Sequence, residues 1–329
     1  MKKSITIKEL SKMLDVSIST VSKALNDSYE ISQPTKERIQ EAAKLYNYRP
    51  NRVAVNLKSG KTNTIGVILP SIKNFFLARA LRGIENVIAK TQYNIIISIT
   101  NESYEKEVQS VQTLANGFVD GIIIAVSEET QMKQDFSHLM EFQEDMPMLM
   151  FDRVVDSIDC DKVIVDDYKA VFNAVNDLKS TGRKHIVLTS TISNLSVGEM
   201  RANGYVDAIK DKHEPIIIEG SEENIENQLE TYIDTDKVDA IIALDEEASL
   251  ASFRIGKKKQ VLNNGKVSLI GYAGTKISEH LTPSLTTINQ HGKRVGNTAA
   301  KLLLEKLKKP LKNPEKVIVN STLCKRSTT

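Results

Sequence analysis

The most distinctive chemical pattern in this chain lies between residues 17 and 26, in the segment SISTVSKALN. At helical spacing Val21, Ala24 and Leu25 share one face. The opposite face carries Ile18, Ser19, Ser22, Lys23 and Asn26. Short, mostly uncharged side chains let a helix approach a major groove closely and bond to base edges, whereas a solvated surface helix usually carries several charges. The pattern therefore favours a DNA-recognition helix, with a small helical hairpin of another role as the alternative.

The flanking residues predict two more helices around this segment. Thr6 and Glu9 have the spacing of a capping box, so we expect a first helix to begin there. Asp15 lies in the following turn, at a position expected to need left-handed backbone, which Asp tolerates better than most residues. Ser17 is expected to cap the second helix and Ser32 to open the third. The third helix is predicted to bury Ile39, Ala42, Ala43 and Tyr46.

Charge is distributed unevenly along the chain. Residues 1–60 carry 11 Lys and Arg against 6 Asp and Glu, although the whole chain has a net charge of only +2. This distribution is typical of a phosphate-binding module attached to a neutral body. We find no signal peptide and no apolar run of the about 18 residues that a membrane span needs, so we expect a cytoplasmic protein. A sugar-binding receptor without a DNA function, the alternative, would have no use for residues 1–59.

No grouping of residues predicts catalysis or metal binding. The five His residues are isolated in the sequence, and neither HxxxH nor CxxC occurs. The GxGxxG, GxxxxGK[ST] and GxSxG motifs are also absent. Cys160 and Cys324 lie far apart and are expected to be reduced packing residues. We therefore predict a protein that is not an enzyme and has no cofactor or metal.

From Thr64 onward, short β-branched runs alternate with segments of helical length. Continuous apolar runs are typical of strands buried on both faces, and their alternation with helices indicates parallel sheets. The expected strands are TIGVIL, NIIISI, DGIIIAV, PMLMF, KVIV, KHIVLT, PIIIE, DAIIAL and VSLIGYA, followed by residues 317–319. These are too many for one sheet of usual size. We predict an α/β body of two doubly wound lobes, with a ligand cleft at the carboxyl ends of the strands.

Several motifs, taken in order, resemble a known family. They are TIKEL at 6–10, VSISTVSKALN at 16–26, NYRPNRVA at 47–54, FDR at 151–153 and PSLTT at 283–287. Together they resemble the lactose-repressor/galactose-repressor family of bacterial transcription regulators over nearly the whole chain. The resemblance implies a homodimer that binds a pseudo-palindromic operator in double-stranded DNA. It favours a repressor of carbohydrate-utilisation genes, controlled by a sugar, a sugar acid, a sugar phosphate or, alternatively, a non-sugar metabolite.

The resemblance also implies the domain division. Residues 1–49 would form a helix-turn-helix headpiece, 50–61 a hinge helix or linker, and 62–329 a periplasmic-binding-protein-like domain for effector binding and dimerisation. Within that domain, we expect lobe 1 to comprise residues 62–161 and 292–329, and lobe 2 to comprise 162–291. Because no leucine-heptad segment follows the last expected strand, a dimer is expected rather than a tetramer.

DNA contacts carried over from the resemblance fall into two groups. Ile18, Ser19 and Lys23 are implied to discriminate base pairs. The residues implied mainly to hold phosphates are Ser17, Thr20, Ser22, Asn26, Tyr29, Ser32 and Thr35. Thr6 is a further expected DNA contact.

The segment after Pro50 has no apolar stripe, and an isolated helix of about two turns is unstable in water. The resemblance implies that it forms a hinge helix on operator DNA. Leu57 would enter a minor-groove step, Ala54 would lie against the groove, and Asn51 and Arg52 would meet the backbone. A flexible linker is the alternative.

Candidate effector residues follow the expected strands. Phe75 and Phe76 are consecutive aromatic residues in a strand-to-helix turn, and one of them is expected to stack on a ligand unless both pack in the core or a dimer interface. Asp152, Asp166 and Asp245 could bind sugar hydroxyls or cap the following helices, and the cap is favoured for Asp245.

Arg201 is placed in the cleft by the resemblance, which implies an effector-binding arginine there. We expect it to be the one fixed cation of the cleft, and its planar fork suits a carboxylate or phosphate. Ala273 and Leu244 depart from the polar residues that sugar-responsive relatives often carry. These departures disfavour a neutral hexose bound in the usual manner.

Overall fold

The computed structural model describes residues 5–48, 61–210, 214–309 and 313–329. Contacts within the chain divide it into two units, Met1–Thr62 and Asn63–Thr329, and each is described by itself. Within the described ranges, no helix combines the length and the apolar character needed to cross a bilayer. Pro50 and the predicted hinge contacts Asn51, Arg52, Ala54 and Leu57 lie outside the described residues.

The first unit contains helices α1 (Ile7–Met13), α2 (Ile18–Leu25) and α3 (Gln33–Leu45). The predicted capping box is present: the Glu9 amide donates to the Thr6 hydroxyl at 3.2 Å, and the Thr6 amide donates to the Glu9 carboxylate at 2.8 Å. Asp15 has φ 48°, the left-handed conformation expected in the turn. The core consists of Leu10, Val21, Ala24, Ile39, Ala42 and Ala43.

One predicted core residue of the headpiece is wrong. Tyr46 is 44% exposed, because α3 ends at Leu45 and the chain turns there. Tyr48, two residues further on, packs against the core in its place.

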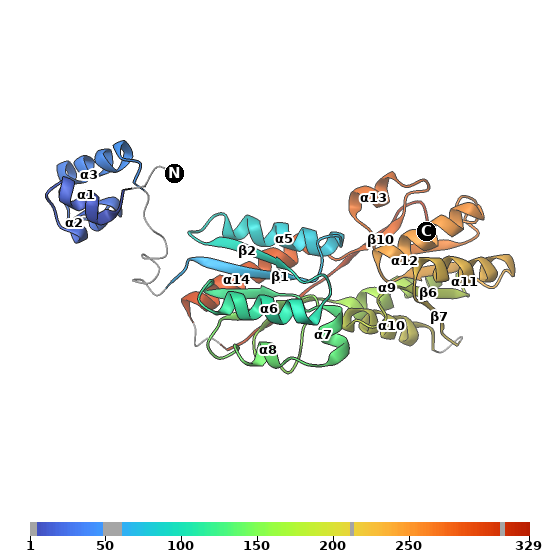
Figure 1. Cartoon of the computed structure of the whole chain (residues 1–329). Coiled ribbons are helices and arrows are strands. Elements are labelled where there is room, and N and C mark those ends of the chain that lie inside the picture. The colour runs from blue at the N-terminus through green and yellow to red at the C-terminus, as the bar shows by residue number, and fades with distance from the viewer. Residues whose placement is uncertain (1–4, 49–60, 211–213, 310–312) are drawn as a thin grey trace. The chain divides into compact units, whose positions relative to one another are not determined.

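Lobe 1 of the second unit is a parallel sheet in the order β11-β5-β4-β3-β1-β2. Figure 1 shows β1 and β2 of this sheet side by side. Its strands are β1 (Thr64–Leu69), β2 (Asn94–Ile99), β3 (Gly121–Ile124), β4 (Met148–Phe151), β5 (Asp161–Val165) and β11 (Lys316–Val319). Helices α5 (Phe75–Ile88) and α14 (Gly292–Lys308) pack on one face. The other face packs against α6 (Tyr104–Ala115) and the short α8 (Ser137–Met140), beside α7 (Glu128–Lys133).

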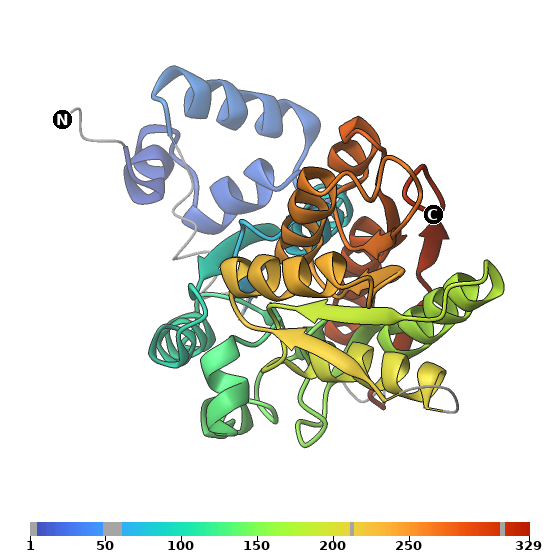
Figure 2. The same ribbon diagram turned by 90° about the vertical axis from the view of Figure 1, so that its right-hand side faces the viewer.

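Lobe 2 repeats the arrangement in the order β12-β10-β9-β8-β6-β7, with β12 antiparallel to β10. The strands are β6 (Ile186–Ser190), β7 (Ile216–Glu219), β8 (Ala240–Ala243), β9 (Ser268–Gly271), β10 (Thr286–Asn289) and β12 (Thr322–Cys324). Figure 2 shows helices on both sides of these strands. The helices are α9 (Asp167–Ser180), α10 (Ser196–Ile209), α11 (Glu222–Asp234), α12 (Glu246–Lys258) and α13 (Thr275–His280).

The doubly wound, two-lobed prediction is confirmed, but the lobe boundaries differ from those expected. β5 pairs with β4 and therefore belongs to lobe 1, although residues from 162 onward were assigned to lobe 2. β12 pairs with β10 in lobe 2, although residues 292–329 were assigned to lobe 1. Hydrogen bonding to a neighbouring strand decides lobe membership, and the local sequence pattern does not show it. The strands β10 and β12 were not among those predicted.

Three crossover segments connect the lobes within the described residues: 165–167, 289–292 and 319–322. Side chains tie them together. The Asp166 carboxylate accepts a hydrogen bond from the Ser321 amide at 2.7 Å. The Thr322 hydroxyl lies 3.0 Å from Nε2 of His291. The crossovers are therefore joined directly to one another beside the cleft.

Glycines allow α14 to lie very close to α5. A Cβ at Gly296 would lie 1.8 Å from the Ala80 carbonyl oxygen, and one at Gly83 would lie 2.2 Å from the Lys293 carbonyl oxygen. Any side chain at either position would separate the helices. This contact fixes the N-terminal turns of α5 and α14 next to each other at the cleft.

Candidate functional site

The headpiece presents the predicted recognition face on α2. Ile18 is 46% exposed and Ser19 is also exposed, while Val21 and Ala24 are fully buried beneath them. An isoleucine exposed to this degree is available for contact with a base edge or a thymine methyl group.

Several predicted phosphate-contacting residues also hold the headpiece together. The Ser17 hydroxyl accepts from the Thr20 amide at 3.0 Å, which caps α2 as predicted. The Ser32 and Thr35 hydroxyls lie 2.8 Å apart. Tyr29, in contrast, is 94% exposed, and within the described residues of the headpiece its side chain has no hydrogen bond of this kind.

Two polar side chains of the same face already have partners within the headpiece. The Lys23 ammonium is paired with the Glu30 carboxylate. The Asn26 side chain donates to the Ser22 carbonyl oxygen at 3.0 Å. Both pairs are exposed, so the side chains can exchange these partners for DNA at small energetic cost.

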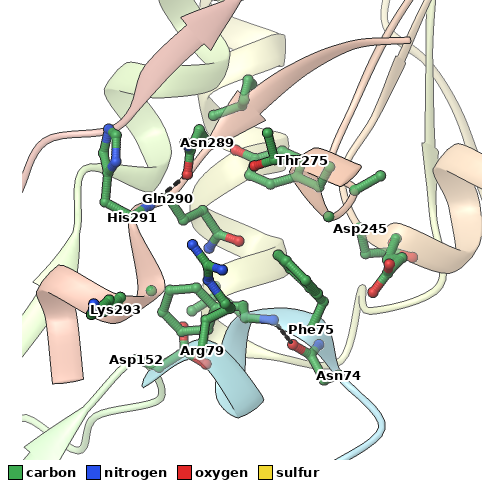
Figure 3. A pocket seen from close by; sticks show the side chains of 18 of the residues that line it. Asn74, Phe75, Arg79, Asp152, Asp245, Thr275, Asn289, Gln290, His291 and Lys293 are labelled. Atoms are coloured by element: carbon green, nitrogen blue, oxygen red, sulfur yellow. Dashed lines mark hydrogen bonds between the residues drawn. The ribbon is translucent and has the colours of Figure 1, made fainter. Parts of the chain in front are cut away.

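A cavity of about 330 Å³ lies between the two lobes, at the carboxyl ends of the strands (Figure 3). This volume is within the range of small-molecule pockets. It is lined by Phe75, Phe76, Asp152, Arg201 and Asp245 among the predicted residues. Asp166 is not part of the lining, because its carboxylate faces the crossover segments and binds the Ser321 amide.

The two aromatic residues play different parts in the cavity. Phe76 packs against the core of lobe 1 as well as lining the cavity. Phe75 reaches lobe 2: a Cβ at Gly274 would lie 2.9 Å from its ring. The ring of Phe75 therefore closes one side of the cleft, and only a glycine at position 274 permits this contact.

Arg201 is 4% exposed and fixed by three interactions within lobe 2. Its Nε donates to the Asp167 carboxylate at 2.7 Å and its Nη1 donates to the Leu244 carbonyl oxygen at 2.6 Å. The guanidinium carbon lies 4.3 Å from the centre of the Tyr272 ring. Burial by itself would lower the pKa of Arg201, but the combined effects of Asp167, Tyr272 and Asp152 outweigh it, and the pKa is raised.

Asp245 and Glu246 are largely occupied by backbone donors. The Asp245 carboxylate caps α12 by accepting from the Ala248 amide at 2.8 Å, as favoured from the sequence, and it also binds the amide and hydroxyl of Thr191. Glu246 accepts from the Phe75 and Gly274 amides, and burial raises the pKa of its carboxyl.

Asp152 has a left-handed backbone, with φ 59°, at the end of β4. Burial raises the pKa of its carboxyl to about 6, against the opposing attraction of the Arg153 guanidinium. Its side chain points toward the cavity in Figure 3. Near neutral pH this carboxyl is mostly ionised and can accept hydrogen bonds from ligand hydroxyls.

Sequence reasoning missed most of the cations at the cavity. Arg201 is not the one cation there: within the described residues the lining also includes Arg79, Arg153, Lys293 and Arg294. Arg79 could have been found, since it lies one helical turn after Phe75 and so shares its face. The residues of α14 depend on long-range packing and carry no local signal.

Comparisons with known proteins agree with this architecture. The family description "Bacterial regulatory proteins, lacI family" matches residues 6–51, and "Periplasmic binding proteins and sugar binding domain of LacI family" matches residues 62–327. The HTH-type transcriptional repressor PurR of Vibrio cholerae serotype O1 is 29% identical over 317 residues, covering 92% of this chain and 91% of that protein. Catabolite control protein A of Priestia megaterium is 28% identical over 314 residues, covering 93% of each.

Solved structures have the same fold. The lac repressor dimer bound to operator and an anti-inducer has a TM-score of 0.86 at 22% identity, covering 99% of both chains. A LacI-family regulator of Enterococcus faecalis V583 with bound ribose has a TM-score of 0.69 at 26% identity, covering 81% of this chain and 98% of that one. With family descriptions matching both the headpiece and the two-lobed body, this chain belongs to the LacI family of bacterial regulatory proteins and is a DNA-binding transcription regulator, not an enzyme.

Proposed function

We propose that this regulator is a homodimeric repressor that binds a pseudo-palindromic operator through α2 and is controlled by a small molecule in the cleft. The observation that carries the DNA part is the outer face of α2, which offers Ile18, Ser19 and Lys23 above the fully buried Val21 and Ala24. A chromosomal operator lies in the bacterial cytoplasm, so the proposal also places the protein there.

The dimer is supported by the edge of the lobe 1 sheet. β2 is the last strand of that sheet, and Ile96 and Ile97 on it are 38% and 50% exposed. An apolar edge strand is normally covered, because it would otherwise pair with other chains. The similar lac repressor structure is a dimer on operator DNA. We expect light scattering to give the mass of a dimer, and a stable tetramer or a monomer at micromolar concentration would contradict the proposal.

The effector is proposed to be a carbohydrate or a derivative of one. The cavity has the size of a small-molecule site, Phe75 and Phe76 supply apolar ring faces, and Asp152 supplies an acceptor for hydroxyl groups. A similar regulator from Enterococcus faecalis was solved with ribose.

Selection of operators from a random DNA pool tests the DNA part. The full-length wild type should return a pseudo-palindromic motif. The double variant Ile18→Ala/Lys23→Ala should return a different or less defined motif, since each base-edge contact contributes about 1–3 kcal/mol of discrimination. The control Thr35→Ala should weaken binding to all sequences alike and keep the motif. An unchanged motif for the double variant would refute the assignment of the recognition face.

A further inference from the structure

Some of the cations at the cavity have an ion-pair partner and others do not. Arg201 is paired with Asp167, and the Arg153 Nη1 donates to the Glu102 carboxylate at 2.6 Å. Among the residues that the structure describes, the other lining cations have no ion-pair partner. These are Arg79, Lys293 and Arg294, and all three are exposed at the N-terminal turns of α5 and α14. The lobe 1 side of the cavity therefore carries positive charge without a carboxylate partner.

Arg79 points into the cavity (Figure 3). Its guanidinium carbon lies 5.5 Å from the centre of the Phe75 ring, a distance at which a cation and an aromatic face attract each other. Because Phe75 is held against Gly274, this contact restrains the guanidinium toward the ligand space.

Two buried donors in the lining have no hydrogen-bond partner. They are the Nε of Arg153 and the hydroxyl of Tyr272, whose residues are 6% and 4% exposed. A buried donor without an acceptor costs about 1–3 kcal/mol, so such groups usually face a ligand or water. Burial raises the pKa of the Tyr272 phenol, which keeps it protonated and able to donate.

The lining also contains hydrogen-bond acceptors, and some of them already have partners. Asp245 and Glu246 are engaged by backbone amides, as described above. The acceptors available to a ligand include the Asp152 carboxyl, the side-chain oxygen of Asn297, which is buried without a partner, and the side-chain amide of Gln290. Acceptors of this kind suit hydroxyl groups, while the unpaired donors and cations suit an anionic group.

From this arrangement we infer that the effector is a polyhydroxylated anion of monosaccharide size, carrying a phosphate or carboxylate group, and that Arg79 binds the anionic group. The inference rests on the proposed effector site and specifies its ligand class. Arg79 binds the anionic group from lobe 1. The charge of Arg201 is already neutralised by Asp167, so Arg201 stabilises the structure of lobe 2.

Matched ligand pairs test the inference on the full-length protein. The probes are glucose with glucose 6-phosphate and gluconate, ribose with ribose 5-phosphate, and inorganic phosphate alone. Thermal shift and calorimetry should show that at least one anionic sugar binds while its neutral partner binds at least about 10-fold more weakly, and that binding weakens with added salt. Binding by sugar phosphates but not gluconate would identify phosphate as the group, and the reverse would identify carboxylate.

Variants of one helix supply the control. Arg79→Met should weaken binding of the anionic sugar about 10- to 100-fold and leave the neutral partner unaffected, since a charge-assisted hydrogen bond is lost. Arg82→Met removes the same charge from α5 at a residue outside the lining, and it should bind the anionic sugar like the wild type.

Three results would overturn the inference: preference for a neutral sugar, anion binding that survives Arg79→Met, or no shift with any anionic probe at millimolar concentration. Operator binding by the same preparations is measured in parallel. Normal operator binding with a neutral effector would remove the anion inference and leave the proposed function intact, whereas loss of specific operator binding in the wild type would remove the proposed function itself.

Discussion

The two lobes meet the cleft with different kinds of surface. On the lobe 2 side, the charged residues Arg201 and Asp245 have partners within that lobe: Arg201 is bound to Asp167 and Leu244, and Asp245 caps its own helix. The lobe 1 side keeps Arg79 without a carboxylate partner among the described residues and leaves the Nε of Arg153 without an acceptor. Apart from the neutral Tyr272 hydroxyl, the lobe 2 side is therefore preorganised, whereas the cationic groups that still need partners lie on lobe 1.

This contrast separates two roles that a cleft residue can have. A charged side chain that is buried and paired within its own lobe determines the shape and stability of that lobe. A charged side chain that is exposed and unpaired contributes little to stability and remains available to a ligand. The same residue type, arginine, fills both roles at positions 201 and 79.

The largest expected effect follows from breaking the lobe 2 pair. Asp167→Asn leaves the Arg201 guanidinium, 4% exposed, without its counter-charge. Breaking a buried pair by removing one partner usually costs about 3–5 kcal/mol, because an uncompensated charge stays buried. We expect urea unfolding of Asp167→Asn to show a loss of free energy of unfolding of this size.

Arg79→Met is the matched change on lobe 1. It removes an exposed charge, so the free energy of unfolding should stay within about 0.5 kcal/mol of the wild type. If Asp167→Asn and Arg79→Met lost similar free energy of unfolding, the distinction between a buried, paired arginine and an exposed arginine available to a ligand would be wrong. The pairing also means that Arg201→Met would destabilise the protein, because the buried Asp167 carboxylate would lose its counter-charge. Loss of effector response in that variant would therefore not by itself identify a ligand contact.

The accuracy of the sequence predictions follows the range of the interactions involved. In the headpiece, the Thr6 capping box, the Ser17 cap and the turn at Asp15 are decided by residues within a few positions, and all three were confirmed. In the body, the strand runs were predicted because their apolar pattern is local. β10 and β12 were missed because TTIN and TLC are short and partly polar.

The lining of the cavity was only partly predictable for the same reason. Strand ends identify Asp152 and Asp245, since ligands bind at the carboxyl ends of parallel strands. Asp166 also follows a strand, yet it faces the crossover at Ser321, a residue 155 positions away. Arg153 was part of a quoted motif and Tyr272 of an expected strand, but no sequence pattern shows that their polar atoms are buried without partners.

Asp152 gives a prediction of intermediate size. Its folded-state pKa is about 6, while an unfolded Asp has a pKa of about 3.9. The folded state binds this proton more tightly, so the contribution of Asp152 to the free energy of unfolding falls as pH rises from about 4 to 6 and stays low above that. Asp152→Asn removes the charge and tolerates the positive φ.

We expect Asp152→Asn to be more stable than the wild type at about pH 7.5, by on the order of 1–2 kcal/mol, and the difference to disappear near pH 4. Urea unfolding at both pH values measures it. Asp159→Asn, at an exposed position of the same lobe, serves as the control and should show no comparable pH-dependent gain. A constant difference across this pH range would mean that the Asp152 carboxyl does not titrate near 6.

The smallest expected effect concerns a contact that joins the two lobes directly. Gln131 on α7 of lobe 1 donates to the Ser196 hydroxyl at 2.8 Å and accepts from the Ser196 amide at 3.2 Å. Ser196 is the first residue of α10, and the N-cap residue Leu195 supplies no side-chain cap. The helix that carries Arg201 is therefore capped by a side chain of the opposite lobe.

A double-mutant cycle of Gln131→Ala and Ser196→Ala measures this contact. Each single variant should lose about 0.5–1.5 kcal/mol of unfolding free energy, the usual net value of a hydrogen bond. The two losses should be non-additive, because the double variant removes a shared contact, and the coupling should exceed about 0.5 kcal/mol. Additive losses would show that the Gln131 side chain and the Ser196 hydroxyl do not interact in solution. Repeating the cycle with effector bound is the sharper test. A coupling energy that grows with ligand would show that lobe closure strengthens this contact. An unchanged coupling energy would show that the lobes are already joined here before the ligand enters.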